Sequence, residues 1–371
     1  MIRKTLLFLW LSANLLSAAG LLAGCYSHAI NDGDYWFLDL LTTITPLLLI
    51  GQPLFVITWL FLKPRMSLIS LCTLMVCWPP LRHVFGFRMG EPFRYEKKRE
   101  HLRVMSWNVE HFKITEYRRD PSQKLEMVRL VRNHYPDIAC FQEMVASDSF
   151  PDAINYLPDF QKSLLFPYVH YSYDRRYDFD RKHHFGLVIF SRHPILRSET
   201  IHVDRKGYNS IFQFADIVSR GDTFRVVNVH LQSLKFTPNN RTYLKDPGMK
   251  DREDMQESES ILRKFKTGYI RRHRQADRVA QVIRNSPYPV ILCGDLNDVP
   301  NSYAYALMEK YLGNAFLQKG TGFGNTYTGL FQGVRIDHIF ADRRMGVSQF
   351  STCRKKLSDH YPVIADLSLI P

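Results

Sequence analysis

The sequence lacks the cysteine spacings that a closed zinc site or a disulfide framework requires. Its six cysteines, at positions 25, 72, 77, 140, 293 and 353, form no CxxC pair and no combined Cys/His ligand spacing. Cys140 and Cys293 lie inside apolar runs, so we expect both to be buried thiols. The glycine-rich stretch at residues 320–324 has no Lys-Ser/Thr after it, which excludes a P-loop and favours a turn. No internal repeat or low-complexity tract is evident, so repeat architectures are excluded as well.

Charged residues are scarce in the first 81 positions, and this scarcity marks a boundary in the chain. Three apolar segments fill the region, at residues 5–26, 40–62 and 66–81. The first two are long enough to cross a bilayer as helices, and Pro46 and Pro53 are expected to kink the second. The third is short and ends in Trp78-Pro79-Pro80, so it is either a tilted span or a re-entrant helix. We therefore predict a multi-pass membrane region over residues 1–85, with two or three transmembrane helices.

Basic flanks orient this membrane region. The positive-inside rule places the N-terminus in the cytoplasm, because basic residues precede the first segment and follow the second: Arg3, Lys4, Lys63 and Arg65. The loop between them carries Asp32 and Asp34 instead. If all three segments cross, the rest of the chain lies outside, on the periplasmic side of a bacterial inner membrane, which is the arrangement we favour. Basic residues also crowd positions 82–99, and they argue for the opposite side if the third segment does not cross.

Residues Leu22-Ala23-Gly24-Cys25 resemble a bacterial lipobox, in which the apolar segment is cleaved and the cysteine is lipidated. We favour an uncleaved anchor, because such four-residue matches arise often in apolar sequence and because further spans follow.

From His101 onward the pattern changes to short apolar runs that alternate with helical stretches. Lys and Arg exceed Asp and Glu over the whole chain by 49 − 36 = 13. This excess favours phosphate-bearing substrates or an anionic membrane surface, although solubility explains it equally well. The pattern predicts a helix over residues 123–134 and strands at 102–108, 137–143, 186–191, 212–218, 224–230, 290–294, 336–340 and 362–367. We expect a basic linker at 86–100, an α/β domain with two helix-covered sheets at 101–371, and a polar insertion at about 235–272.

Polar side chains stand at the ends of five of these apolar runs, where strands would bring them to a common rim. The motifs are Ser106-Trp107-Asn108, Phe141-Gln142-Glu143, Val229-His230-Leu231, Gly294-Asp295-Leu296-Asn297 and Ser358-Asp359-His360. In Asp295-x-Asn297 the i, i+2 spacing puts both side chains on one face of an extended segment. A single motif of this length is mostly surface chemistry, but five in order are not.

Hydrolysis of a phosphoester needs a hard cation to neutralise charge, a base to activate water and a group that assists the leaving oxygen. Carboxylate and amide oxygens suit Mg²⁺ or Mn²⁺, and two histidines remain for proton chemistry. His183, His184 and Asn209 are expected to be ordinary loop residues rather than substrate contacts.

Together with Arg335-Ile336-Asp337-His338, these motifs resemble the endonuclease/exonuclease/phosphatase superfamily in order and spacing over roughly residues 101–369. This superfamily includes deoxyribonucleases, abasic-site endonucleases, neutral sphingomyelinases and inositol polyphosphate 5-phosphatases. The resemblance implies a four-layer αββα sandwich. It also implies metal ligation by Glu143, Asn108 and Asp359, and a role for Asp295 and Asn297 in orienting water and holding the phosphate.

The same resemblance implies that His360, oriented by Asp337, acts as general base or transition-state stabiliser. His230 resembles the histidine of the deoxyribonuclease and sphingomyelinase branches, where it assists the leaving group. Abasic-site endonucleases have a different residue there, so that branch is disfavoured.

The sequence thus predicts a membrane-anchored, divalent-metal-dependent phosphodiesterase or phosphatase. Its candidate substrates are nucleic acids and phospholipid head groups, its other partner is the lipid bilayer, and no obligate protein partner is inferred. One alternative is a nuclease acting on DNA or RNA. A second, of another class, is a catalytically inactive membrane binding module.

Overall fold

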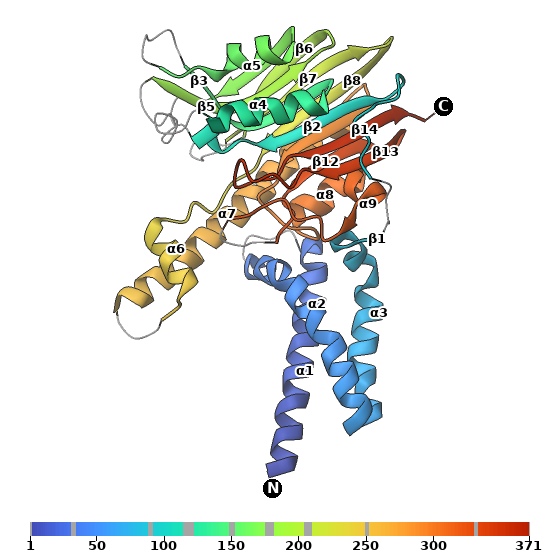
Figure 1. Cartoon of the computed structure of the whole chain (residues 1–371). Helices are drawn as coiled ribbons and strands as arrows, with labels where there is room; N and C mark the ends of the chain where they lie inside the picture. The colour runs from blue at the N-terminus through green and yellow to red at the C-terminus, as the bar shows by residue number, and fades with distance from the viewer. Residues whose placement is uncertain are drawn as a thin grey trace. The chain divides into compact units, whose positions relative to one another are not determined.

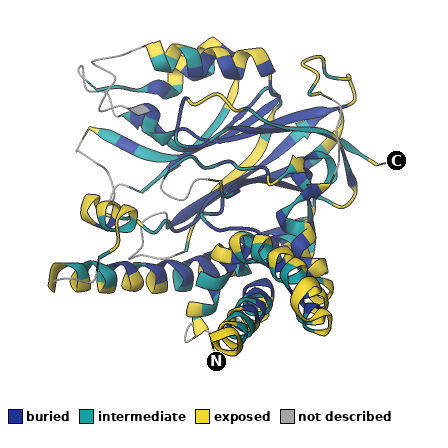
Figure 2. Cartoon of the chain, turned by 60° about the horizontal axis from the view of Figure 1, so that its bottom comes forward, coloured by how far each residue is buried: buried dark blue, intermediate teal, exposed yellow. Residues whose placement is uncertain are grey.

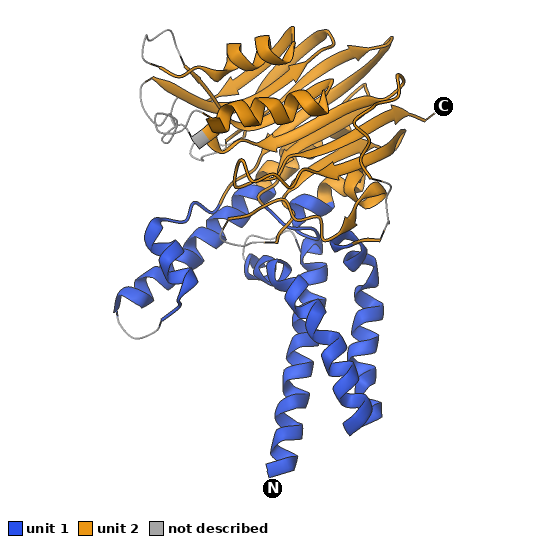
Figure 3. Cartoon of the chain, in the orientation of Figure 1, with its two compact units in different colours: residues 1–85, 234–273, 298–306 blue, residues 86–233, 274–297, 307–371 orange. Residues whose placement is uncertain are grey.

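A computed structural model describes residues 2–30, 35–87, 92–113, 122–147, 153–174, 182–203, 210–248, 252–329 and 333–370. Asp32, Asp34 and Asn209 lie outside these ranges. The chain divides into two compact units (Figure 3). Unit 1 comprises residues 1–85, 234–273 and 298–306, and unit 2 comprises residues 86–233, 274–297 and 307–371.

Unit 2 is built on two six-stranded sheets. The first has the order β13-β14-β2-β3-β5-β4, with β2 Leu102–Asn108, β3 Ile138–Ser147, β4 Tyr168–Tyr173, β5 His183–Ser191, β13 Met345–Thr352 and β14 Val363–Leu369. The second has the order β10-β12-β9-β8-β7-β6, with β6 Ile195–His202, β7 Ile211–Ser219, β8 Asp222–His230, β9 Val290–Asp295, β10 Leu312–Asn314 and β12 Asp337–Asp342. A small pair, β1 Gly86–Phe87 and β11 Thr321–Gly322, forms a separate two-stranded sheet.

The two sheets pack face to face and each carries helices on its outer side (Figure 1). Side chains such as Val104 and Ile189 from the first sheet and Val226 and Ile291 from the second form the core between them. Helices α4 Ser122–His134 and α5 Tyr156–Leu164 pack their apolar residues on the outer face of the first sheet. The C-terminal part of α7 Arg252–Arg284 lies on the opposite side of the sandwich. The short α9 Ala315–Lys319 lies at the edge of the sandwich, because Ala315 joins the core between the sheets and the Phe316 ring contacts Phe350 of β13. The four-layer αββα sandwich expected from the sequence is therefore confirmed.

Burial on both faces explains why the central strands read as continuous apolar runs rather than as alternating patterns. Every residue of β2 and of β9 is buried, and the buried residues follow the strands through the sandwich (Figure 2). The edge strand β6 has mostly exposed residues, so it produces no such run.

Unit 1 contains the helices α1 Ile2–Tyr26, α2 Phe37–Leu62 and α3 Ser67–Val84, with the 3₁₀ turns η1 Ser27–Ala29 and η3 Pro64–Met66. Among the described residues, two helices are long and apolar enough to cross a membrane, Ile2–Ala29 and Phe37–Leu62, and α3 does not meet the same test. The interior of the bundle is partly polar. Asn14 donates to Ser70 (2.7 Å) and accepts from the Trp59 indole (3.0 Å), a pattern that holds apolar helices together where side chains cannot reach water.

The polar insertion is helical. It forms α6 Pro238–Lys245 and the first part of α7, which begins at Arg252, so its acidic stretch lies in the first turns of the long helix. Unit 1 joins this part of α7 to α2 through an ion pair between His273 and Asp39 (3.1 Å) and a bond between the hydroxyls of Tyr269 and Thr43 (3.0 Å).

Candidate active site

Parallel strand pairs bring the polar motifs to one rim of the sandwich. β2 pairs with β3 in parallel, so Asn108, at the end of β2, lies opposite Gln142 and beside Glu143. β8 pairs with β9 in the same way, which places His230 directly opposite Asp295. The antiparallel strand β12 begins at this rim, with Asp337 opposite Asp295. The carboxyl ends of parallel neighbours meet at the same edge, and this geometry explains why motifs far apart in sequence converge.

The predicted site residues form one connected cluster. The Asn108 amide donates to Asp295 Oδ2 (3.2 Å) and to Glu143 Oε1 (3.5 Å). His230 Nε2 lies 3.5 Å from Asp295 Oδ2 and 3.8 Å from Glu143 Oε1. The Asn297 backbone N–H donates to Asp295 Oδ1 (2.7 Å), and its side-chain amide donates to Asp295 Oδ2 (3.3 Å). Asp295 is thus the centre of the cluster, and its side chain is fully buried.

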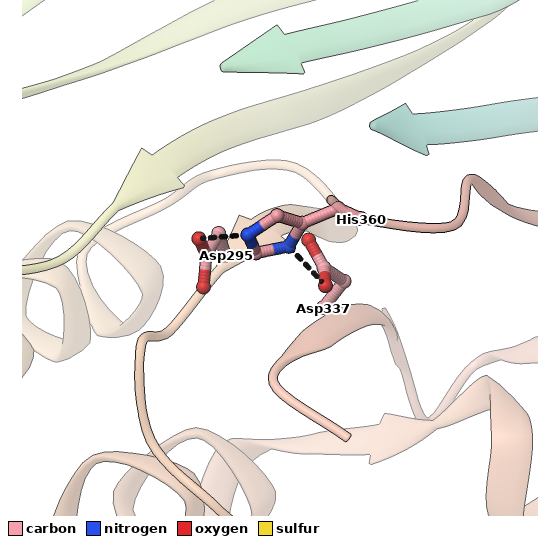
Figure 4. Close-up of side chains that lie close together, drawn as sticks. All are labelled: Asp295, Asp337 and His360. Carbon is pink, nitrogen blue, oxygen red and sulfur yellow. Dashed lines mark hydrogen bonds and ion pairs between the residues drawn. The ribbon is translucent and has the colours of Figure 1, made fainter. Parts of the chain in front are cut away.

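His360 lies between two carboxylates (Figure 4). Its Nδ1 forms a 2.8 Å hydrogen bond with Asp337 Oδ2, and its Nε2 lies 3.8 Å from both Asp295 Oδ2 and Asp359 Oδ1. The bond to Asp337 fixes the orientation of the ring and assigns the proton-bearing nitrogen on that side. All eight residues named from the sequence, Asn108, Glu143, His230, Asp295, Asn297, Asp337, Asp359 and His360, are therefore brought together.

The two histidines have opposite electrostatic surroundings. Burial opposes the charged form of His360, but the carboxylates of Asp337 and Asp295 outweigh it and raise the pKa of His360 to about 10. Burial dominates at His230 and lowers its pKa to about 4. Burial likewise raises the pKa of Asp295 to about 7. At neutral pH one imidazole is therefore charged and the other neutral, which is the kind of separation that active sites use to divide acid and base roles.

Backbone strain gathers at the same place. Glu143 (φ 59°) and Asn297 (φ 50°) adopt left-handed conformations that residues with a Cβ rarely take, and Glu110 (φ 47°) and His111 (φ 53°) do the same just after β2. Glu143 lies where the register of β3 and β5 shifts, which re-aims its side chain. Gly294 (φ 146°) precedes Asp295, and a Cβ there would lie 2.0 Å from the Val229 carbonyl oxygen. Strained residues of this kind persist where the surrounding structure holds them for a function.

The donor atoms fit a hard divalent cation. Glu143 and Asp359 present carboxylates whose side chains are 20% and 36% exposed. The Asn108 side-chain nitrogen faces Glu143 Oε1 and its Oδ1 accepts the Glu110 backbone N–H, so Oδ1 is the Asn108 atom that would ligate a cation. Oxygen donors of this type are those that Mg²⁺ and Mn²⁺ prefer. Asp295, Asp337 and His360 also place one ligand atom each within 4.8 Å of one another. We favour the first group, because His360 is already bonded to Asp337 and Asp295 already accepts three hydrogen bonds.

Two site residues were missed by the sequence patterns. His111 Nδ1 lies 3.0 Å from Glu143 Oε2, and Glu110 accepts a hydrogen bond from the Asp359 backbone N–H (2.9 Å). Both lie in the turn η4 Glu110–Lys113. Their nearness to Asn108 in the sequence was the only available signal.

His183 and His184 belong to strand β5 rather than to a loop. His183 Nε2 accepts the Ile154 backbone N–H (3.0 Å), and the His184 ring stacks on Tyr173 at 4.2 Å. Cys140 and Cys293 are fully buried between the sheets, as expected.

Comparison with known proteins agrees with this geometry. A sequence profile of the Endonuclease/Exonuclease/phosphatase family matches residues 105–360, and a profile of a domain of unknown function matches residues 3–84. No curated protein matches the chain.

Solved structures of similar fold include the endonuclease/exonuclease/phosphatase of Bacteroides vulgatus, with 17% identity, a TM-score of 0.52, and coverage of 73% of this chain and 99% of that one. A family protein of Bacteroides thetaiotaomicron has 18% identity, a TM-score of 0.51, and coverage of 73% and 98%. The human Nocturnin catalytic domain with bound sulfate has 17% identity, a TM-score of 0.51, and coverage of 74% and 95%. The fold and the profile match together show that the chain belongs to the endonuclease/exonuclease/phosphatase family, whose members are hydrolases that act on phosphoester bonds.

Proposed function

We propose that this protein is a membrane-anchored phosphoester hydrolase that requires Mg²⁺ or Mn²⁺. The observation that carries the proposal is the cluster itself: carboxylate, amide and imidazole groups from both sheets lie within hydrogen-bonding or ion-pair reach of Asp295 or His360. A structural core has no need of so many buried, mutually repelling acids, because burial of unneutralised carboxylates is costly.

In the proposed mechanism, Glu143, Asn108 and Asp359 would hold the cation, which would supply positive charge to neutralise the phosphate. Asp295 and Asn297 orient the attacking water and hold the phosphate. Asp337 fixes His360 with its Nε2 facing Asp295. Because His360 is charged at neutral pH, it is better suited to stabilise negative charge in the transition state than to remove a proton. Of the two roles that the family resemblance implies for His360, general base and transition-state stabiliser, we therefore propose the second.

His230 would donate a hydrogen bond to the leaving oxygen. Strands β8 and β12 flank β9, so His230 and Asp337 lie on opposite sides of Asp295, and His230 Nε2 faces the Asp295 carboxylate. The water proton would pass to Asp295, whose raised pKa of about 7 makes it a stronger base than an ordinary aspartate.

Membrane attachment would come from α1 and α2, which pass the length and hydropathy test for spans. We propose that α3 crosses as well, because three spans from a cytoplasmic N-terminus put the catalytic domain on the periplasmic side of a bacterial inner membrane, whereas two spans would return it to the cytoplasm. Alkaline phosphatase fused after Glu100 should then be active in cells, and an expressed but silent fusion would place the domain in the cytoplasm.

The activity test uses the full chain in detergent, with bis-p-nitrophenyl phosphate and p-nitrophenyl phosphate as generic diester and monoester substrates. We expect turnover with Mg²⁺ or Mn²⁺, loss of turnover with a chelator, and loss in both Glu143→Ala and His360→Ala. His202→Ala, at an exposed position of β6, serves as the matched control. Turnover that survives both active-site changes contradicts the site assignment.

A metal-supplemented screen with DNA, RNA, sphingomyelin, phosphatidylinositol phosphates and nucleotides then separates the candidate substrates. Membrane anchoring favours lipid head groups, whereas turnover of DNA or RNA would identify a nuclease. Binding of lipid vesicles without turnover of any phosphoester would identify the inactive binding module.

A further inference from the structure

Three consecutive residues with side chains adopt left-handed backbone conformations directly after β2. They are Glu110, His111 and Phe112, with φ values of 47°, 53° and 52°. Residues with a Cβ avoid this region because the Cβ approaches the following carbonyl oxygen. A run of three persists only where the surroundings hold it in place. Contacts with the rest of the fold must therefore stabilise this turn.

The first and third residues of the turn are fixed by their own contacts. The Glu110 backbone N–H donates to Asn108 Oδ1 (3.1 Å), and its carboxylate accepts the Asp359 backbone N–H (2.9 Å). Phe112 is buried, and its ring contacts those of Tyr156 and Phe160 at 4.9 Å each. With both neighbours held, the direction of the residue between them is determined.

That residue, His111, points to Glu143. Its Nδ1 lies 3.0 Å from Glu143 Oε2. Its ring meets Phe185 edge to face at 4.5 Å and 88°, which limits rotation of the imidazole. The side chain remains 31% exposed, so it is an accessible part of the site rather than a piece of the core. The other oxygen of the carboxylate, Glu143 Oε1, faces the Asn108 amide at 3.5 Å.

We propose that His111 is a positioning residue that holds the Glu143 carboxylate through an Nδ1–H···Oε2 hydrogen bond, so that Oε1, on the Asn108 side, is the oxygen that would ligate the cation. The proposal rests on the proposed function, since it assumes that Glu143 is a metal ligand. It assigns the left-handed turn a purpose: η4 carries the hydrogen-bond donor that orients the ligand. Partners of this kind typically change metal affinity by about 10–100-fold when they are removed.

Three substitutions of His111 distinguish the effect of its Nδ1–H donor from the effect of its aromatic ring. His111→Phe keeps an aromatic edge against Phe185 and removes the donor. His111→Asn places an amide N–H close to the position of Nδ1, whereas His111→Gln places it close to Nε2. His202→Asn, at an exposed position of β6, is the control.

The measurement is Mn²⁺ binding to the full chain in detergent, by calorimetry and by electron paramagnetic resonance. We expect His111→Phe to weaken Mn²⁺ binding by roughly 10–100-fold, and His111→Asn to restore most of the loss while His111→Gln restores little. Turnover by His111→Phe should recover at high Mn²⁺ concentration. Turnover by Glu143→Ala should not.

Several outcomes overturn the proposal. If His111→Phe binds Mn²⁺ like the parent while Glu143→Ala does not, His111 has no positioning role although the proposed function survives. If bound Mn²⁺ shows a nitrogen coupling that disappears in His111→Asn, His111 is a direct ligand. If the parent protein binds no Mn²⁺, the proposed function fails and this proposal fails with it. Should His111→Phe not fold, the comparison of His111→Asn with His111→Gln still decides, because equal affinities contradict a donor at Nδ1.

Discussion

Two Arg–Asp pairs in unit 2 have nearly the same bidentate geometry but differ in burial, so they allow a matched test of how burial affects stability. Arg103 donates from Nε and Nη2 to the two oxygens of Asp366 (2.7 and 2.8 Å), and both side chains are 1% exposed. Arg344 donates in the same way to Asp342 (2.9 and 2.8 Å), but its side chain is 64% exposed. We predict that the first pair contributes far more to stability than the second.

The expected magnitudes follow from what each substitution leaves unpaired. Asp366→Asn turns an acceptor oxygen into a donor beside a buried guanidinium, which should cost about 3–5 kcal/mol. Arg103→Met should cost still more. It leaves Asp366 buried without its cation and also removes the donor from three backbone carbonyls, those of Arg94, Tyr95 and His134. Asp342→Asn breaks a pair whose arginine is exposed, although the Asp342 side chain is only 18% exposed and also accepts the Arg344 backbone N–H. A pair with one solvated partner is worth about 0–1 kcal/mol.

Thermal unfolding of the full chain in detergent, followed by tryptophan fluorescence, checks this order. A loss of 3–5 kcal/mol should lower the Tm by roughly 6–20 °C, since 1 kcal/mol corresponds to about 2–4 °C in domains of this size. Asp342→Asn should shift it by only a few degrees. If Asp366→Asn and Asp342→Asn have equal Tm values, or if Arg103→Met is more stable than Asp366→Asn, the burial argument is refuted.

Three further predictions concern other parts of the chain. Burial lowers the pKa of His134, so the unfolded chain takes up the proton first and stability falls as pH drops below about 6.5; His134→Gln should flatten this slope in denaturant titrations at pH 5.5 to 7.5. Gly294→Ala should lower both Tm and turnover, because its Cβ would collide with the Val229 carbonyl at 2.0 Å. Arg272→Met should lower the free energy of unfolding by about 3–5 kcal/mol, and with it the Tm, since it leaves buried Asp298 without its 3.0 Å partner. Adding Asp298→Asn to this variant should recover part of the lost stability.

The central strands and the convergence of seven of the eight candidate site residues could be predicted from local patterns, whereas Asp337, at the start of β12, was indicated only by the family resemblance. A strand buried on both faces is an apolar run, and a polar group at its end lies at the rim of the sheet. For β2 the predicted and observed bounds coincide at Leu102–Asn108. The edge strand β4 could not be found in this way, because most of its residues are partly exposed and its pairing with β5 is a tertiary contact.

The contribution of η4 to the site was also beyond the sequence patterns. Turn prediction relies on glycine, asparagine and proline, and Val109-Glu110-His111-Phe112 contains none of them. Tertiary contacts of Glu110 and Phe112 impose the left-handed conformation, and these contacts come from segments distant in the sequence.

Residues 92–100 of the basic segment, which was expected to act as a linker, belong to unit 2 and pack on its other residues. Phe93 and Tyr95 contact the His134 ring at 5.8 and 5.1 Å, and the Arg103 guanidinium lies over Phe93 at 4.9 Å. Lys97 pairs with Asp137. The aromatic residues between the charges provide the surface that anchors this segment.

The interactions within unit 1 decide which form of the protein is suitable for these experiments. Asp298 follows Asn297 directly in the chain and pairs with Arg272 of α7. The next residue of that helix, His273, pairs with Asp39 of α2, and both side chains are at most 10% exposed. A chain trimmed to residues 95–371 would therefore lose Asp39 and expose or neutralise a buried histidine beside the pair that holds Asp298. Removing one member of a buried ion pair costs more than the pair itself contributes, because the remaining group stays desolvated. Loss of activity in the trimmed chain would thus report damage to α7 and to the segment after Asn297, and only the full chain tests the chemistry of Glu143 and His360.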